Sequence, residues 1–233
     1  MNKIFISGDT HGYFKRFSFK NWPLGRILTK EDVCIITGDF GGIWLNTPDK
    51  DETYWLNWLN DRPWTTVFCD GNHCNFTRLN NLPRVEKFGG IVGQVHDSIF
   101  HLRRGQVYNI NENTFFVMGG AKSIDKQHRT EWISWWAEEE PNYQELSEGL
   151  DNLEKVGNKV DYIVGHTCPI SVLKRLGTIC GVSYGDKLEN LNKYFEEIIQ
   201  FVSFRKMFFG HFHEDENIDG IFHALYKDII QIK

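Results

Sequence analysis

Short runs of apolar residues recur along the chain, and each is about as long as a β-strand. They are rich in Val, Ile and Phe, and several are apolar at successive positions, which is typical of strands buried on both faces. The pattern predicts strands at residues 3–7, 33–37, 65–68, 114–118, 160–164 and 206–209.

Helical spacing of apolar residues occurs between several of these runs. It predicts helices at residues 51–59, 145–155 and 187–201. In the last of these, one stripe contains Leu188, Leu191, Phe195, Ile198 and Ile199. Strands that alternate with helices indicate an α/β domain.

Residues 85–120 have a different pattern, in which strand-like pieces follow one another with only turns between them. The stretch Asn111-Glu112-Asn113 reads as a hairpin turn. This middle region is therefore predicted to be antiparallel, and a last strand is predicted at 229–232. The middle pieces are residues 90–95, 98–103, 106–110 and 114–118.

Composition places the chain among globular proteins and disfavours several classes of function. Its 233 residues are 41% hydrophobic and 15% aromatic, enough for one domain over residues 1–233 with an ample core. The formal charge of −5 argues against a non-specific DNA binder, but not against a nuclease that contacts phosphate through metal. We find no stretch typical of a signal peptide or membrane helix, and five scattered cysteines favour a reducing compartment. We therefore expect a cytoplasmic protein without a membrane partner.

Glycine-flanked polar motifs follow five of the predicted strands. The carboxyl ends of parallel strands meet at one edge of a sheet, where ligands of α/β proteins bind. If the five strands are parallel neighbours, two Asp, one Asn and five His side chains gather there. Each motif alone also reads as an ordinary turn, so the joint pattern carries the inference. The motifs are GDTHG at 8–12, GDFGG at 38–42, GNH at 71–73, GH at 165–166 and GHFH at 210–213.

Such a donor set suits metal ions. Carboxylate, carboxamide and imidazole together favour borderline first-row ions such as Mn, Fe, Zn or Co over Ca or Mg. Seven ligands are too many for one tetrahedral ion, and they suit two octahedral ions that share a carboxylate. Two such ions form a known clamp for displacement at phosphorus.

The ordered motif set resembles the calcineurin-like metallophosphoesterase superfamily, over residues 8–213. The resemblance implies the fold of that superfamily, an α/β fold in which a two-sheet mixed β-sandwich is flanked by helices (α/β/β/α). It also implies a dinuclear-metal-dependent phosphoester hydrolase with two divalent transition-metal ions, Mn being favoured over Fe, Zn, Ni or Co.

The resemblance assigns seven metal ligands, all on the glycine-flanked loops. One ion would be bound by Asp9, His11 and His213, the other by Asn72, His166 and His211, and both by a bridging Asp39.

His73 resembles the family's non-ligand histidine. In that role it binds a phosphate oxygen and protonates the leaving alkoxide, while metal-bound hydroxide attacks in line. Asp39 and His73 are therefore the predicted catalytic residues, and Asn72 and His73 are both expected to contact substrate.

The second motif departs from one branch of the superfamily. Serine/threonine phosphatases and their diadenosine-tetraphosphatase relatives continue it as GDxxDRG, whereas this chain has GDFGGIW. In that branch the Asp orients the catalytic histidine and the Arg binds phosphate, so the orientation of His73 lacks an explanation here. Cys74 also follows His73, where the family often has Glu or Asp. The departure favours a phosphodiesterase acting on nucleotides or nucleic-acid ends.

Candidate phosphate-binding side chains lie in the loops. Arg78 follows His73 by five residues and either reaches phosphate or lies on an exposed helix face. Lys122 and Arg129 lie in the polar stretch 119–129 and are further candidates. The expected substrate is a small phosphoester or nucleotide, with nucleic-acid ends as another candidate partner.

The polar stretch is followed by a cluster of tryptophans and acidic residues. Trp132 and Trp136 either stack on a flat substrate group or form the core stripe of a short helix. Trp44, just after the second motif, is another candidate wall of the site. The acidic run at 138–140 reads as solvated surface.

Two other functions are compatible with the motifs. A phosphomonoesterase for small metabolites or phosphoproteins would use the same metal ligands. A non-catalytic scaffold on the same fold, like the retromer scaffold subunit, would normally have lost ligands, whereas here the set is complete.

Overall fold

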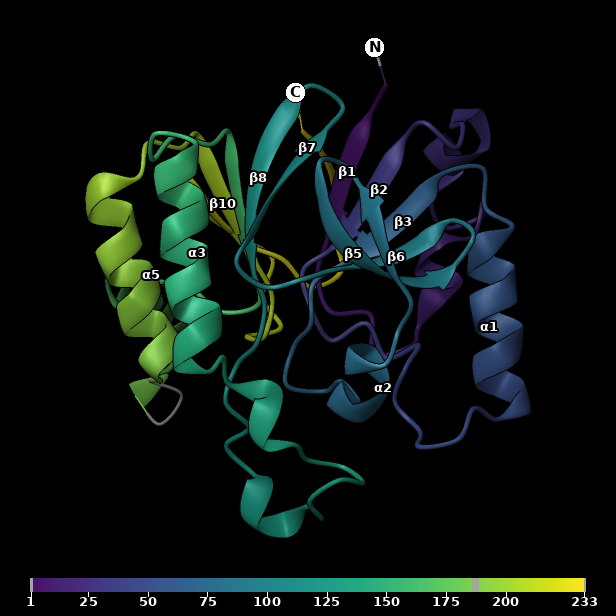
Figure 1. The fold of residues 1–233 in the computed structure, drawn as a ribbon, viewed down its shortest axis with the longest axis horizontal. Coiled ribbons are helices and arrows are strands. Elements are labelled where there is room, and N and C mark those ends of the chain that lie inside the picture. The colour runs from purple at the N-terminus through teal and green to yellow at the C-terminus, as the bar shows by residue number, and fades with distance from the viewer. Residues whose placement is uncertain (1, 186–188, 233) are drawn as a thin grey trace.

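The computed structural model describes residues 2–185 and 189–232, in which two β-sheets pack face to face with helices outside them (Figure 1). This arrangement confirms the predicted α/β/β/α class. The strands are β1 (Ile4–Ser7), β2 (Val33–Ile36), β3 (Thr65–Phe68), β4 (Arg84–Lys87), β5 (Gly90–His96), β6 (Ile99–Leu102), β7 (Gln106–Ile110), β8 (Asn113–Met118), β9 (Tyr162–Gly165), β10 (Lys206–Phe209), β11 (Glu216–Ile218), β12 (Phe222–Ala224) and β13 (Ile229–Ile232).

Five α-helices and four short 3-10 helices connect the described strands. Three of the α-helices begin at side-chain caps, and Asn142 forms a capping box with Glu145. The helices are α1 (Lys50–Asn60), α2 (Phe76–Asn80), α3 (Tyr143–Lys155), α4 (Ile170–Cys180) and α5 (Asn190–Phe201), with η1 (Phe14–Phe17), η2 (Pro23–Ile27), η3 (Lys126–His128) and η4 (Ala137–Glu139).

The first sheet has the strand order β13-β1-β2-β3-β6-β5-β4, and the second has the order β11-β12-β10-β9-β8-β7. Strands β1, β2 and β3 are parallel neighbours, and so are β8, β9 and β10. The middle of the chain adds the antiparallel strands β4, β5 and β6 to the first sheet and the hairpin β7–β8 to the second. The antiparallel prediction for this region is therefore confirmed.

The strands are apolar at successive positions because both of their faces are covered. In β1 and β2, Ile6 and Ile35 point into the core between the sheets, together with Phe208 of the second sheet. Their neighbours Phe5 and Ile36 point outward into the cluster beneath α1. Alternation of side chains along a strand makes every residue buried when both faces are packed.

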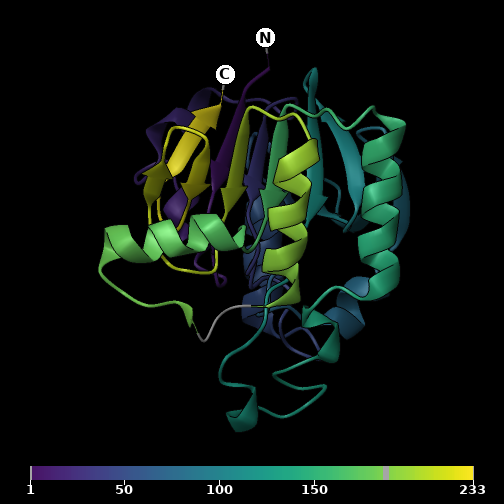
Figure 2. The same ribbon diagram turned by 90° about the vertical axis from the view of Figure 1, so that its left-hand side faces the viewer.

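Helices α3, α4 and α5 cover the outer face of the second sheet (Figure 2). Leu173 of α4 and Phe195 and Ile198 of α5 are buried there against Phe209 of β10. The helix predicted at 187–201 begins at Asn190, and its proposed first residues, Lys187 and Leu188, lie outside the described residues. Helix α4 was not predicted, although its apolar spacing was a usable signal.

The turn predicted between β7 and β8 is confirmed. Asn111 and Glu112 have φ angles of 49° and 65°, and Ile110 pairs with Asn113 across them. Two successive residues with positive φ make the turn whose twist matches a tight hairpin. Over residues 2–185 and 189–232, no helix has the length and apolarity needed to cross a membrane.

Candidate metal centre

The loops after β1, β2, β3, β9 and β10 meet at the same end of the sandwich, so the five polar motifs converge. They come from two packed sheets, whereas the sequence pattern alone suggested the edge of one. The first sheet supplies the motifs after β1, β2 and β3, and the second supplies those after β9 and β10. The seven predicted ligands brought together are Asp9, His11, Asp39, Asn72, His166, His211 and His213.

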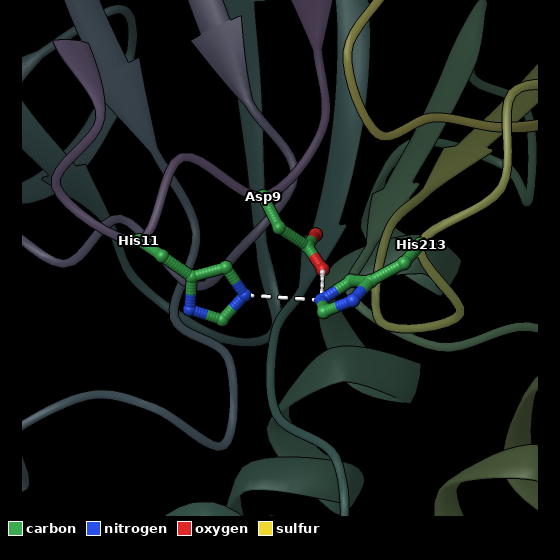
Figure 3. A group of neighbouring side chains, drawn as sticks. All are labelled: Asp9, His11 and His213. Atoms are coloured by element: carbon green, nitrogen blue, oxygen red, sulfur yellow. Dashed lines mark hydrogen bonds and ion pairs between the residues drawn. The ribbon is translucent and has the colours of Figure 1, made fainter.

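One group of donors consists of Asp9, His11 and His213 (Figure 3). The two imidazoles point toward each other, with Nε2 of His11 3.0 Å from Nε2 of His213. Oδ2 of Asp9 lies 3.3 Å from the same His213 nitrogen. All three donor atoms lie within 4.8 Å of one another, as ligands of one ion would.

A second group surrounds Asn72. Its Oδ1 lies 3.2 Å from Nε2 of His166 and 3.0 Å from Nδ1 of His211. Nδ1 of His166 donates to the carbonyl of Thr37 at 2.8 Å, which directs Nε2 toward the centre. A backbone carbonyl on the far nitrogen is the usual way in which a protein orients a metal-binding histidine.

Asp39 lies between the two groups. Its Oδ2 is 3.3 Å from Nε2 of His166 and 3.7 Å from Nε2 of His11. Its Oδ1 accepts a hydrogen bond of 2.7 Å from the backbone N–H of His73. This position is the one that a carboxylate bridging two ions would need.

The spacing of the donor atoms fits first-row ions. Two ligands at right angles, each about 2.1 Å from an octahedral ion, lie roughly 3.0 Å apart. Five donor pairs have separations of 3.0 to 3.3 Å, and Asp39 and His11 lie farther apart, at 3.7 Å. The mixture of imidazole, carboxylate and amide oxygen matches the same ions, so the residues fit a dinuclear centre.

Backbone conformation at the centre is unusual. His11, Asp39, His211 and His213 have φ angles of 45°, 43°, 70° and 57°. Non-glycine residues rarely adopt this left-handed region, and such outliers concentrate at functional sites. Four of the seven predicted ligands are therefore held in conformations that the local sequence does not favour.

The flanking glycines are needed for close approach. Gly38 has a φ angle of 100°, and a Cβ there would overlap the ring of His166. A Cβ on Gly210 would overlap Oδ1 of Asp9. These two positions explain why the ligands of the two sheets can approach one another so closely.

The buried carboxylates favour positive charge at this centre. Burial alone lowers the pKa of His166, but Asp39 and Asp9 outweigh it and raise the pKa to about 10. Burial raises the pKa of Asp39, but His166, His73 and His11 outweigh it and hold the pKa well below its usual range. The same electrostatics would favour a metal cation in the position of a proton.

A short hydrogen-bond chain orients Asn72. Its Nδ2 donates to Oγ of Ser123 at 3.1 Å, and Ser123 donates to Oε2 of Glu139 at 2.8 Å. The amide oxygen is thereby turned toward the two histidines. Glu139 is only 2% exposed, so the reading of 138–140 as solvated surface is wrong for this residue. The run looked like surface because its buried partner, Ser123, is 16 residues away.

His73 lies beside the two groups, and its surroundings answer the question left by the missing Asp-Arg pair. Arg129 approaches both ring nitrogens, at 3.3 Å from Nδ1 and 3.1 Å from Nε2. Asp125 holds the guanidinium through Nε and a terminal nitrogen, both at 2.9 Å. Burial lowers the pKa of His73, Asp39 opposes this and Arg129 adds to the lowering. The ring of Trp44 lies 5.7 Å from the ring of His73 and forms a wall beside it.

The other predicted substrate-binding side chains have different surroundings. Lys122 is half-buried next to Ser123. Arg78 forms a two-point ion pair with Glu52, with distances of 2.6 and 2.9 Å, and also donates to the carbonyl of Leu45. The structure therefore accounts for Arg78 through its bond to α1 and does not bring it together with the ligands.

The tryptophan segment is not the short helix considered above. Residues around Trp132 form turns and an isolated bridge between Glu131 and Trp135. Trp136 is fully buried and meets Trp44 edge-on at 5.7 Å, whereas Trp132 is 52% exposed. Of these two tryptophans, only Trp136 is therefore a core residue.

A buried charge cluster beneath the third motif was missed from the sequence. Asp70 accepts from Nε of Arg104 at 2.8 Å and lies 3.0 Å from Nε2 of His101. Burial raises the pKa of Asp70, but Arg104 and His101 outweigh it and lower the pKa. Asp70 directly precedes Gly71 and Asn72, so the cluster anchors the loop that carries a predicted ligand. The position of Asp70 just after a predicted strand was the signal in the sequence that could have revealed it.

A two-sheet α/β sandwich with two groups of oxygen and nitrogen donors at one end defines a class, the metal-dependent phosphoesterases. The sequence model of the calcineurin-like phosphoesterase family matches residues 2–215. The chain belongs to the calcineurin-like phosphoesterase family, whose members hydrolyse phosphoesters with dinuclear divalent metals. A search of curated proteins found no match to this chain.

Proposed function

We propose that this protein is a phosphodiesterase that hydrolyses esters of nucleotides or nucleic-acid ends, with Mn as its preferred metal. The observation that carries the proposal is the convergence of seven ligand side chains with His73 alongside them. The preference for diesters is supported by the second motif, which lacks the Asp-Arg pair of the protein phosphatases.

Each residue has a definite task in this proposal. Asp9, His11 and His213 hold one ion, Asn72, His166 and His211 hold the other, and Asp39 bridges them. Two ions bound there would neutralise phosphate oxygens and lower the pKa of an attacking water.

The chain's own groups complete the chemistry. The imidazole of His73 donates a proton to the leaving oxygen, so that an alkoxide leaves as an alcohol. The guanidinium of Arg129, held in place by Asp125, binds a phosphate oxygen, and Lys122, next to Ser123 in the same segment, is a second candidate for that contact. Arg78 has a weaker case, because its contacts are with Glu52 and Leu45, whereas Arg129 also contacts His73.

The decisive experiment compares two substrates with the same leaving group. Protein stripped of metal and reloaded with Mn is assayed on bis-p-nitrophenyl phosphate and on p-nitrophenyl phosphate. We expect Mn-dependent turnover with a higher kcat/KM for the diester. A higher value for the monoester would replace the proposal with a phosphomonoesterase. Lack of turnover of both would favour a scaffold.

A further inference from the structure

A cavity adjoins the candidate metal centre and has no role in the chemistry described so far. Its volume is about 500 Å³, within the range of small-molecule sites. Its lining includes Asp9 and His11 together with Tyr13, Tyr226 and Lys227. The cavity therefore opens directly onto the first group of ligands.

Polar contacts fix the part of this cavity that residues 226–228 form. The carboxylate of Asp215 accepts hydrogen bonds from the backbone N–H groups of Tyr226, Lys227 and Asp228, at 2.7 to 3.1 Å. The guanidinium of Arg16 donates to the carbonyl of Asp9 at 2.7 Å and to the carbonyl of Tyr226. Since these bonds join the N-terminal loop to the C-terminal segment, the site is formed before any ligand arrives.

The lining is aromatic and carries charges of both signs, with Arg16 and Lys227 beside Asp9 and Asp228. The ring of Tyr226 is stacked on His213 at 4.5 Å, and the ammonium of Lys227 lies 5.1 Å from that ring. Tyr13 is 58% exposed, which leaves its ring open for stacking. Flat rings such as nucleobases bind to such surfaces with little dependence on their identity.

The position of His73 tells which part of a substrate this cavity would hold. Hydrolysis forms a bond from a water oxygen to phosphorus and breaks one ester bond, whose oxygen leaves with a proton from His73. The leaving group must therefore lie beside His73, which borders Trp44 and Arg129. Among the described residues, the cavity is lined by Asp9 and His11, whose ring meets that of His73 edge-on at 5.2 Å, but not by His73 or Arg129 themselves. A group in the cavity would thus stay attached to phosphorus.

We propose that this cavity binds the retained ester group of a phosphodiester, an aromatic or nucleoside group that stacks on Tyr13 beside Lys227. The inference rests on the proposed function and deepens it, because a phosphomonoester has no retained group to fill the cavity. Tyr226 and Lys227 lie beyond residue 215, where the family match ends.

The test varies the retained group while the leaving group stays nitrophenolate. Mn-loaded protein is assayed on methyl p-nitrophenyl phosphate and on the p-nitrophenyl ester of thymidine 5′-monophosphate. We expect kcat/KM to be about tenfold or more higher for the thymidine ester, the usual effect of one stacked base. Equal values for the two diesters would overturn the inference while the proposed function stands. Turnover of neither would count against the proposed function itself.

Variants at exposed positions locate the effect. Tyr13→Ala and Lys227→Ala are expected to reduce the preference for the thymidine ester several-fold and to leave the methyl ester within about twofold. Tyr54→Ala is the matched control, because Tyr54 on α1 is also 58% exposed. Titration calorimetry with thymidine 5′-monophosphate and inorganic phosphate gives a readout independent of turnover. Tyr13→Ala should weaken binding of the nucleotide alone; an unchanged affinity ratio would refute the assignment.

Discussion

Asp39 contacts residues of both groups of predicted ligands and also His73. One of its oxygens lies near His166 and His11, and the other accepts the N–H of His73. It also has a positive φ angle, which keeps its carboxylate directed between the two groups. Asp39 therefore links the two groups of predicted ligands to His73, the proposed general acid.

We expect Asp39→Asn to lower kcat by about a thousandfold or more, because a neutral amide cannot bridge two cations. Asparagine retains an oxygen that can accept the N–H of His73, so the loop should keep its shape. Steady-state kinetics on bis-p-nitrophenyl phosphate with Mn provide the measurement, and circular dichroism checks the fold. A rate within tenfold of the wild type would contradict the bridging role.

The role of His73 is tested by the quality of the leaving group. His73→Ala should slow alkyl esters about 100-fold to 10,000-fold, because an alkoxide needs a proton in order to leave. The hydrolysis rate of nitrophenyl esters should fall far less, because nitrophenolate leaves without a proton. The kcat/KM values of matched alkyl and nitrophenyl diesters decide the matter. An equal loss on both would mean that His73 only binds or positions phosphate.

The segment between β8 and α3 is the element that most affects the site while having little regular structure. It extends away from the two sheets in Figure 1, and its short helices are η3 and η4. It nevertheless carries Ser123 and Glu139, which orient Asn72, and Arg129, which contacts His73. The segment thus contributes to both predicted functions of the third motif, metal binding and proton donation.

Ser123→Ala should weaken Mn binding about 10-fold to 100-fold, as removal of an outer-shell partner commonly does. The variant removes the acceptor of the Asn72 amide, so that its oxygen is no longer held toward His166 and His211. Titration calorimetry with Mn measures the effect. Ser134→Ala is the control, since the Ser134 hydroxyl bonds Thr130 within the same segment. Equal Mn affinity in both variants would show that the Ser123 bond is dispensable.

At the scale of the whole molecule, the centre joins the two sheets. Asp9, Asp39 and Asn72 come from the first sheet, and His166 and His211 come from the second. An ion held by both sets would link the halves of the sandwich. Metal binding should therefore stabilise the complete fold and not only its loops.

Saturation with Mn should raise Tm by about 5 to 10 °C. A metal at 100 times its Kd contributes about 2.7 kcal/mol to the free energy of unfolding, and 1 kcal/mol corresponds to about 2–4 °C in a chain of this size. Differential scanning calorimetry with and without a chelator measures the shift. Asp39→Asn should show a smaller shift, and an unchanged Tm in the wild type would argue against ligands from both sheets sharing the ions.

Much of the fold was predictable because local patterns and the core agree. The apolar runs around Ile6, Ile35 and Val67 are strands, and the Asn111–Glu112 turn forms as expected. Helix α2, with five residues, and strands β4, β11 and β12 were missed, because β4 is half-exposed and β11 and β12 have three residues each; helix α4 was missed although its apolar spacing was a usable signal. Short or half-exposed elements carry too little periodicity to stand out.

The ordered motifs, and the family resemblance that they carry, already identified the candidate ligands from Asp9 to His213, since each lies within three residues of a glycine at a strand end. The family resemblance also supplied their grouping, whereas the folded chain alone revealed the buried Glu139–Ser123–Asn72 chain, the Asp70–Arg104 pair and the contact of Arg129 with His73. Local sequence encodes strand ends and turns, which depend on neighbouring residues. Contacts between residues 16 to 56 positions apart depend on how two sheets and a long loop pack, and no local pattern records that packing.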